Sequence, residues 1–148
     1  MPPDDPDPFD LKRFVRAQES DYKPALEEIA AGRKRSHWMW YIFPQFAGLG
    51  LSPTSRHYAI GSLDEARAYL AHPILGSRLI ECAEATLAVE GRSAHDIFGS
   101  PDDMKLRSSV TLFALVSPEH SVFHRVLEKY FDGKRDERTL DLVAHRSG

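Results

Sequence analysis

Residues 100–113 read SPDDMKLRSSVTLF, and this stretch decides which fold class the chain can adopt. A serine, a proline and two aspartates in succession are typical of a helix start, with a cap, a rigid first residue and acid in the first turn. Leu106, Val110 and Phe113 then recur at helical spacing. The stretch therefore predicts a helix that starts near residue 101 and packs one apolar face into a core.

The same helix signals recur on both sides of this stretch. Ser62 and Glu65 have the spacing of a capping box, as do Ser93 and Asp96, and glycines follow several apolar-periodic runs. Six or seven short helices without alternating strands indicate an all-α fold, as a single compact orthogonal multi-helix domain. The expected helices cover about 8–19, 20–31, 62–71, 73–90, 101–114 and 118–132, with a short helical turn at 93–99 and a last helix around 140–143.

Residues 36–61 lack the helical period. The run SHWMWYIFPQ is apolar and aromatic, Pro44 interrupts it, and Gly48, Gly50 and Ser52-Pro53 are turn signals. We expect a short buried extended segment with room for a small β element near residues 40–43. A long loop and an ordered piece around residues 56–60 would follow. A connection of this length in a compact domain is often functional.

The chain has 148 residues, which suits one domain. Residues 1–8 read MPPDDPDP and cannot form a core element, so we expect a disordered acidic and proline-rich lead-in before a helical domain over residues 9–146. Because four of the 22 acidic residues fall in the first ten positions, the remaining chain holds 19 basic and 18 acidic residues. That balance excludes a basic coat for DNA or RNA.

Other classes of protein are excluded by what the sequence lacks. Cys82 is the single cysteine, which excludes a disulfide framework and a cysteine-rich zinc site. No apolar run approaches the ~20 residues of a membrane span, and no signal pattern begins the chain. His120 and His124 have helical metal-pair spacing without a third ligand, and no glycine-rich nucleotide motif is present. We therefore expect a soluble cytoplasmic protein without metal, cofactor or membrane partner.

The first candidate for a binding site is the run from Arg33 to Phe46, where three bases lead into five aromatic residues. One interpretation is a stacking wall beside cationic phosphate contacts, which suits a nucleotide. The alternative is a buried segment that fills the core. The polar amide of Gln45 needs a partner among such apolar neighbours. The candidate ligand-binding residues of this run are Arg35, His37, Trp38, Trp40, Tyr41 and Gln45.

The second candidate lies on the helix quoted above. On a helix, Lys105, Ser108 and Ser109 share one face, opposite the apolar one. They could form a polar pocket wall, or they could be surface ion pairing with hydroxyls that bond back to the helix. Arg107 is a further candidate anion contact. A third, weaker candidate is the His57-Tyr58 pair. The candidate catalytic residues are Asp102, Asp103, Lys105 and His57.

The two strings carry a resemblance to a known family. Residues 37–45, HWMWYIFPQ, and residues 105–113, KLRSSVTLF, resemble the domain-of-unknown-function 1810 family, together with shorter matching pieces over roughly residues 7–143. The resemblance implies the all-α fold and no particular activity. Relatives are often labelled calpastatin-like, but such inhibitors are disordered and repeat-built, unlike this chain.

A fainter similarity links Glu65-Ala66, Asp102-x-x-Lys105 and a leucine- and phenylalanine-rich helix pair to the NADAR family, which acts on N-glycosidic bonds of ADP-ribose-type substrates. Arg56-His57 stands where that family has a Glu-His pair, so no catalytic residue is carried over.

Three functions therefore follow as hypotheses. The first is a pocket for a nucleotide-like or ADP-ribose-like phosphate-bearing small molecule, with N-glycosidic hydrolysis as a reaction it could support. A glycosidic cleavage needs a carboxylate near the anomeric carbon, and Asp102 and Asp103 are nearest in sequence. The second is a protein–protein module, which would expose several of Trp38, Trp40, Tyr41 and Phe43 on a flat patch. In the third hypothesis, the aromatic run and the segment that contains Lys105 both have a purely structural role.

Overall fold

The structure is a computed structural model that describes residues 7–147, and it confirms the all-α fold. Within these residues there are nine helices and no strand, and Phe46 and Ile60 form an isolated parallel bridge. The helices are α1 (Lys12–Ala30), α2 (Met39–Ile42), α3 (Pro53–His57), α4 (Leu63–Ala71), α5 (Leu75–Ala88), α6 (Ala94–Phe98), α7 (Asp102–Leu115), α8 (Val122–Phe131) and α9 (Glu137–Ser147).

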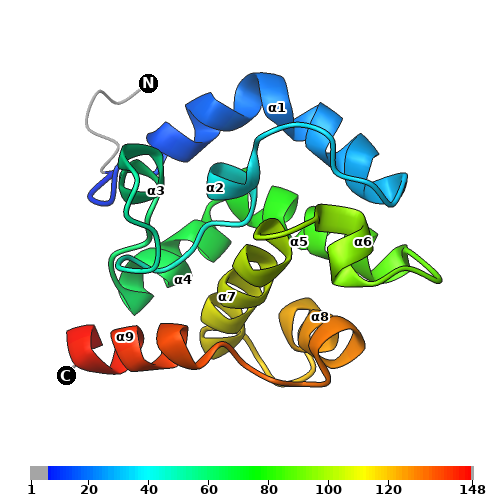
Figure 1. The fold of residues 1–148 in the computed structure, drawn as a ribbon. Helices are drawn as coiled ribbons and strands as arrows, with labels where there is room; N and C mark the ends of the chain where they lie inside the picture. Colours follow the sequence, from blue (N-terminus) through cyan, green and yellow to red (C-terminus); the bar gives the residue numbers. More distant parts are fainter. Residues whose placement is uncertain (1–6, 148) are drawn as a thin grey trace.

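The helices are arranged around α5 and α7. In Figure 1, α1 runs along the top of the molecule, α8 and α9 lie along the bottom, and α5 and α7 pass between them. Helix α1 packs on α5, α4 packs on both central helices, and α7 contacts α6, α8 and α9. The segment between α2 and α3 runs down one side toward α9 (Figure 1). The first eight residues, for which we expect disorder, fall mostly outside the described range.

A row of aromatic rings forms the centre of the core. Tyr69 of α4 lies edge-on to Phe14 of α1 at 5.1 Å between ring centroids, and it also contacts Phe113 at 5.4 Å. Phe113 in turn lies 5.8 Å from Phe123 of α8. All four rings are buried, so one set of aromatic contacts ties four helices together. The apolar face predicted for α7 is confirmed, since Leu106, Val110 and Phe113 are fully buried.

The expected break between residues 19 and 20 is wrong, because α1 is continuous across it. Its buried side chains Phe14, Gln18, Ala25 and Ile29 stay on one face along the whole helix. The helix even contains Pro24. Packing of this face against the core outweighs the local preference of Ser20 and Asp21 for a helix start, since tertiary context routinely overrides propensity.

Three other boundaries differ from the expectation. The extended segment expected near residues 40–43 is the short helix α2, which buries Met39 and Ile42. Helix α8 starts at Val122 rather than near residue 118, because Ser121 is its cap and accepts a hydrogen bond from the amide of His124. Pro101 occupies the cap position of α7 in place of Ser100.

The turn after α1 is held by one carboxylate. Glu28 accepts hydrogen bonds from the amide of Arg35 at 2.7 Å, from the hydroxyl of Ser36 at 2.5 Å and from the indole N–H of Trp38 at 2.9 Å. Burial alone would raise the pKa of Glu28, but these bonds to Ser36, Arg35 and Trp38 outweigh burial and lower the pKa from 4.5 to about 2. The ionised carboxylate therefore stabilises the segment that leads into α2.

We expect Glu28→Gln to lower the free energy of unfolding by about 1–2 kcal/mol at neutral pH, since the lost bonds are to a charged group. Because the folded pKa of Glu28 lies below its unfolded value of 4.5, the contribution is complete above about pH 4.5 and disappears as the pH falls through about 2. Urea unfolding of both proteins between pH 6 and pH 2 measures this. Glu27→Gln, at an exposed neighbour, is the control. If the difference in free energy of unfolding between the wild-type chain and Glu28→Gln did not shrink as the pH falls, the lowered pKa of Glu28 would be contradicted.

Candidate functional site

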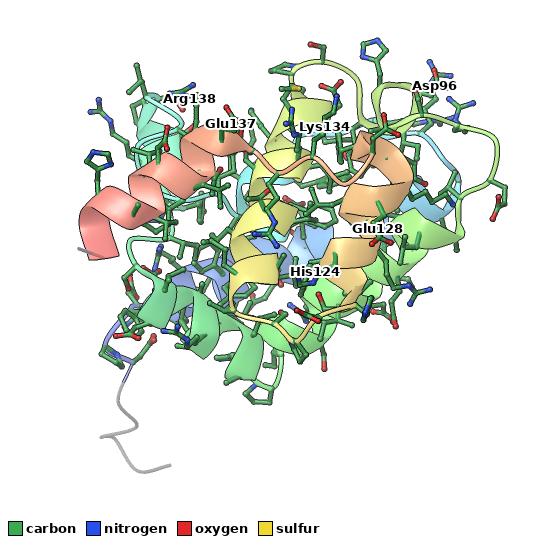
Figure 2. The ribbon with its side chains drawn as sticks, turned by 90° about the horizontal axis from the view of Figure 1, so that it is seen from below. Asp96, His124, Glu128, Lys134, Glu137 and Arg138 are labelled. Atoms are coloured by element: carbon green, nitrogen blue, oxygen red, sulfur yellow. The ribbon has the colours of Figure 1, made fainter. Side chains whose placement is uncertain are left out.

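Residues from both candidate segments, the run from Arg33 to Phe46 and the helix that contains Lys105, line one cavity. It has a volume of about 260 Å³ and lies between the loop after α2, the first half of α7 and the start of α9. Figure 2 shows Arg138 on the first turn of α9, next to Glu137, with Lys134 on the segment that leads into the helix. The residues that line the cavity are Gln45, Leu49, Gly50, Ser55, Pro101, Met104, Lys105, Ser108, Asp136 and Arg138.

Lys105 supplies a cation to this cavity and is held in place by two neighbours. Its ammonium nitrogen lies 5.2 Å from the centroid of the Trp40 ring and 3.5 Å from a carboxylate oxygen of Asp102. A quarter of the Lys105 side chain is exposed. The amine is therefore positioned by an aromatic face and a carboxylate while it remains accessible.

Asp102 is shared between two lysines. Its other oxygen lies 2.8 Å from the ammonium nitrogen of Lys34, whose side chain is only 6% exposed. Lys34 also donates to the carbonyl of Ser36 at 2.5 Å and lies over the ring of Trp38. Lys34 is thus the nearer partner of Asp102, and the more distant Lys105 keeps part of its charge available for a ligand.

Asp136 is the carboxylate of the cavity. Its Oδ2 atom accepts hydrogen bonds from the hydroxyl of Ser108 at 2.9 Å, the hydroxyl of Thr139 at 2.5 Å and the amide of Thr139 at 3.2 Å. The amide of Asp136 donates to the hydroxyl of Thr111 at 3.0 Å. The carboxylate group is therefore fixed by α7 on one side and by α9 on the other.

Two polar side chains of the cavity are left without partners. Gln45 and Arg138 form no side-chain hydrogen bond or ion pair with any other described residue, although the carbonyl of Gln45 accepts from the amide of Ile60 at 2.9 Å. Their amide and guanidinium groups are available donors.

Gly50 allows the loop its close turn, because a Cβ there would lie 2.4 Å from the Cβ of Ser55.

Several candidate residues of the aromatic run lie outside the cavity. Trp38 is buried, with its ring edge-on to Phe98. Tyr41 donates from its hydroxyl to Asp21, and burial and this bond raise its pKa. Arg35 and His37 are exposed on the turn after α1. These four therefore do not line this cavity, and the burial of Trp38 fits the core interpretation. Trp40 does not line the cavity either, but its ring contacts Lys105, which does.

The other candidates are also separated from the cavity. His57 is exposed and lies against the ring of Tyr58, which contacts Tyr41 and Phe14 instead. Asp103 lies 3.6 Å from the Nδ1 atom of His95. The Arg107 guanidinium donates to the carbonyls of Lys134 and Arg135 and so fixes the segment before α9.

Ser109 does not share the cavity face with Lys105 and Ser108. It is fully buried, and its hydroxyl has no hydrogen-bond partner among the described residues. The expectation of a common polar face is therefore wrong at this position, because α7 is enclosed on nearly all sides and its polar face is only as wide as the cavity.

We expect Ser109→Ala to raise the free energy of unfolding by about 1 kcal/mol, since an unsatisfied buried hydroxyl is costly. Ser108→Ala should lower it by a similar amount, because it removes a bond to Asp136. Thermal and urea unfolding of the two variants should therefore show changes in the free energy of unfolding of opposite sign. A destabilised Ser109→Ala protein would show that this hydroxyl has a partner.

Sequence reasoning missed Ser55, Asp136 and Arg138 as cavity residues. Ser55 was visible only as part of the turn that Ser52 caps. Asp136 and Arg138 belong to the charged run KRDER at residues 134–138, which is typical of a solvated turn. Glu65, the residue of the fainter family similarity, forms an ion pair with Arg13 at 2.8 Å and does not line the cavity.

Two features are absent from the described residues. None of the helices within residues 7–147 is long and apolar enough to cross a membrane. No group of three His, Cys, Asp or Glu side chains in the same residues is placed to hold a metal ion.

The sequence of the chain matches a known family over most of its length. The model of the family described as "Protein of unknown function (DUF1810)" matches residues 8–143, so the chain belongs to this family. The chain is also similar to a crystal structure of the conserved hypothetical protein Rv1873 from Mycobacterium tuberculosis, with 54% identity and a TM-score of 0.91. That match covers 93% of this chain and 99% of the other. No match was found among curated proteins.

Proposed function

We propose that the cavity binds a small nucleotide-like ligand that carries a phosphate group. The observation that supports this most directly is the convergence of Gln45, Lys105 and Arg138 on one cavity from three separate parts of the chain. Two cations and one carboxylate give the lining a positive balance. Lys105 and Arg138 would contact the phosphate oxygens, and the Gln45 amide would orient the ligand.

The size of the cavity limits the part of the ligand that it can enclose. A volume of about 260 Å³ is just below the ~300–1,000 Å³ of ordinary small-molecule sites. It suits a sugar phosphate better than a whole dinucleotide. A base would then lie at the rim, where Met104 is half exposed and Leu49 also lines the opening.

Hydrolysis of an N-glycosidic bond belongs to the same proposal, but the candidate catalytic carboxylate differs from those that the sequence suggests. A carboxylate has to stabilise positive charge at the anomeric carbon. Asp102 and Asp103 do not line the cavity and are paired with lysine and histidine side chains, whereas Asp136 lines the cavity. Asp136 is therefore the carboxylate to test, and a cytoplasmic location remains part of the proposal.

A protein–protein module is less well supported. Trp38 and Phe43, which that function would expose, are both buried. The large exposed apolar side chains among the described residues belong to different segments: Leu51, Ile74, Ile80 and Met104.

The test is a thermal-shift and calorimetric titration with AMP, ADP-ribose and adenosine. A ligand at 100 times its Kd should add about 2.7 kcal/mol of stability. We expect AMP to bind more tightly than adenosine, and Lys105→Ala to weaken AMP binding about tenfold or more, because it removes a charge-assisted contact. Lys12→Ala, at an exposed lysine remote from the cavity, is the matched control. Equal binding of AMP by both variants would contradict the proposal, as would no binding of any of the three compounds.

A further inference from the structure

The cavity contains a charge that a site for a bare anion would not need. Lys105 and Arg138 suit a phosphate, but Asp136 lines the same cavity and would repel one. An ionised carboxylate only accepts hydrogen bonds. A ligand that satisfies all three residues must therefore carry an anionic group and also hydrogen-bond donors.

One carboxylate oxygen of Asp136 accepts hydrogen bonds within the protein, and the other is free to accept them from a ligand. Its Oδ2 atom already accepts three hydrogen bonds, from Ser108 and Thr139. Its Oδ1 atom accepts none from any described residue, and it is not among the described buried side-chain atoms that lack a partner, so it reaches solvent. A free carboxylate oxygen has lone pairs for up to two hydroxyl donors.

The carboxylate cannot easily turn away from the cavity. The Thr111 and Thr139 side chains that contact Asp136 are fully buried, and Ser108 is nearly so. The hydroxyl of Thr111 holds the backbone amide of Asp136, and rotation of the carboxylate would take away the acceptor of the buried Thr139 hydroxyl and of the Thr139 amide, which is costly. The Oδ1 atom is therefore a preorganised acceptor on a residue that lines the same cavity as Lys105 and Arg138.

We propose that Asp136 selects ligands in which a phosphate and neighbouring hydroxyl groups are carried by one small sugar, as in a ribose 5-phosphate unit. This inference rests on the proposed function and names the part of the ligand that the cavity recognises. The phosphate faces Lys105 and Arg138, and the sugar hydroxyls donate to the free oxygen of Asp136. The residue thereby discriminates against free phosphate and against sugars that lack these hydroxyls.

Calorimetric titration of the full chain with AMP, 2′,3′-dideoxy-AMP and inorganic phosphate tests this inference. We expect AMP to bind at least about tenfold more tightly than the other two, because hydrogen bonds to a charged group are worth at least that factor. In Asp136→Asn the preference should fall to within about threefold, with phosphate binding improved. Asp141→Asn, which removes an exposed charge from α9, the helix that begins directly after Asp136, should leave the preference unchanged.

The outcomes separate the inference from the proposed function. Equal binding of all three ligands by the wild-type chain would overturn the role of Asp136 and leave a phosphate site in place. Binding of none of the three would overturn both. The comparison of ligands on the wild-type chain needs no variant to fold, and a preference that survives in folded Asp136→Asn would also overturn the inference.

Discussion

Replacing Arg13 with alanine is expected to lower the free energy of unfolding by about 3–5 kcal/mol, the range for removal of one partner from a buried ion pair. Arg13 lies 2.8 Å from the carboxylate of Glu65, and their side chains are only 12% and 9% exposed. Without Arg13, Glu65 would be a largely buried charge with only the amide of Gly61 as a remaining donor from another segment.

The other bonds of Arg13 add to this effect. Its guanidinium donates to the carbonyls of Phe9 and Asp10 before α1, to that of His57 at the end of α3 and to that of Ala59 just after α3. Arg13 thus ties the start of the helical domain to the end of the long segment that contains the cavity loop. Its loss should loosen both, because a lysine or alanine cannot replace this planar set of donors.

Urea unfolding of Arg13→Ala measures the loss. Arg16→Ala is the matched control, since Arg16 is exposed on the same helix, and its effect should stay within about 0.5 kcal/mol. Arg13→Ala with Glu65→Gln should recover part of the loss, because the unpaired charge is removed. A loss for Arg13→Ala as small as that of the control would contradict this account.

Replacing Lys34 with methionine is expected to cost about 2–3 kcal/mol, below the full cost of breaking a buried pair. Lys34 is 94% buried at its side chain and lies 2.8 Å from Asp102, but Asp102 is 20% exposed and keeps Lys105 as a second partner. Methionine has a similar apolar stem, so the loss reports chiefly on the charge.

Lys34→Met should also weaken AMP binding severalfold, since Lys105 becomes the only lysine near Asp102 and is drawn toward it. Chemical denaturation and calorimetric titration measure the two effects. Arg33→Met, at the exposed neighbouring position, should change neither. Stability close to that of the wild-type chain would show that the Lys34–Asp102 pair contributes little.

The features of the fold that depend on local pattern could be predicted from the sequence. The apolar face of α7 and the capping box of α6 are present where the spacing places them. Such features follow from contacts within one turn of helix, so a single sequence contains the information. The nine helices within residues 7–147 exceed the six or seven expected, because α2 and α3 are too short to show a period.

The remaining features depend on contacts between distant segments. Ser109 has a polar side chain of the kind found in binding sites. It is nevertheless buried in the core, because α6, α8 and α9 enclose α7. Asp136 is held at the cavity in part by α7, since Ser108, 28 positions earlier, donates to its carboxylate and Thr111 accepts from its amide. No local pattern in residues 134–138 reveals these bonds.

The most direct test of the central claim is to record the backbone amide resonances of the ¹⁵N-labelled chain during titration with AMP. The account predicts that the largest shifts occur at the cavity, at Gln45, Gly50, Lys105, Ser108 and Arg138. It also predicts that these shifts are lost in Lys105→Ala. Shifts centred elsewhere, for example at the apolar depression beside Ile80 and Val122, or no shift at saturating AMP, would contradict it.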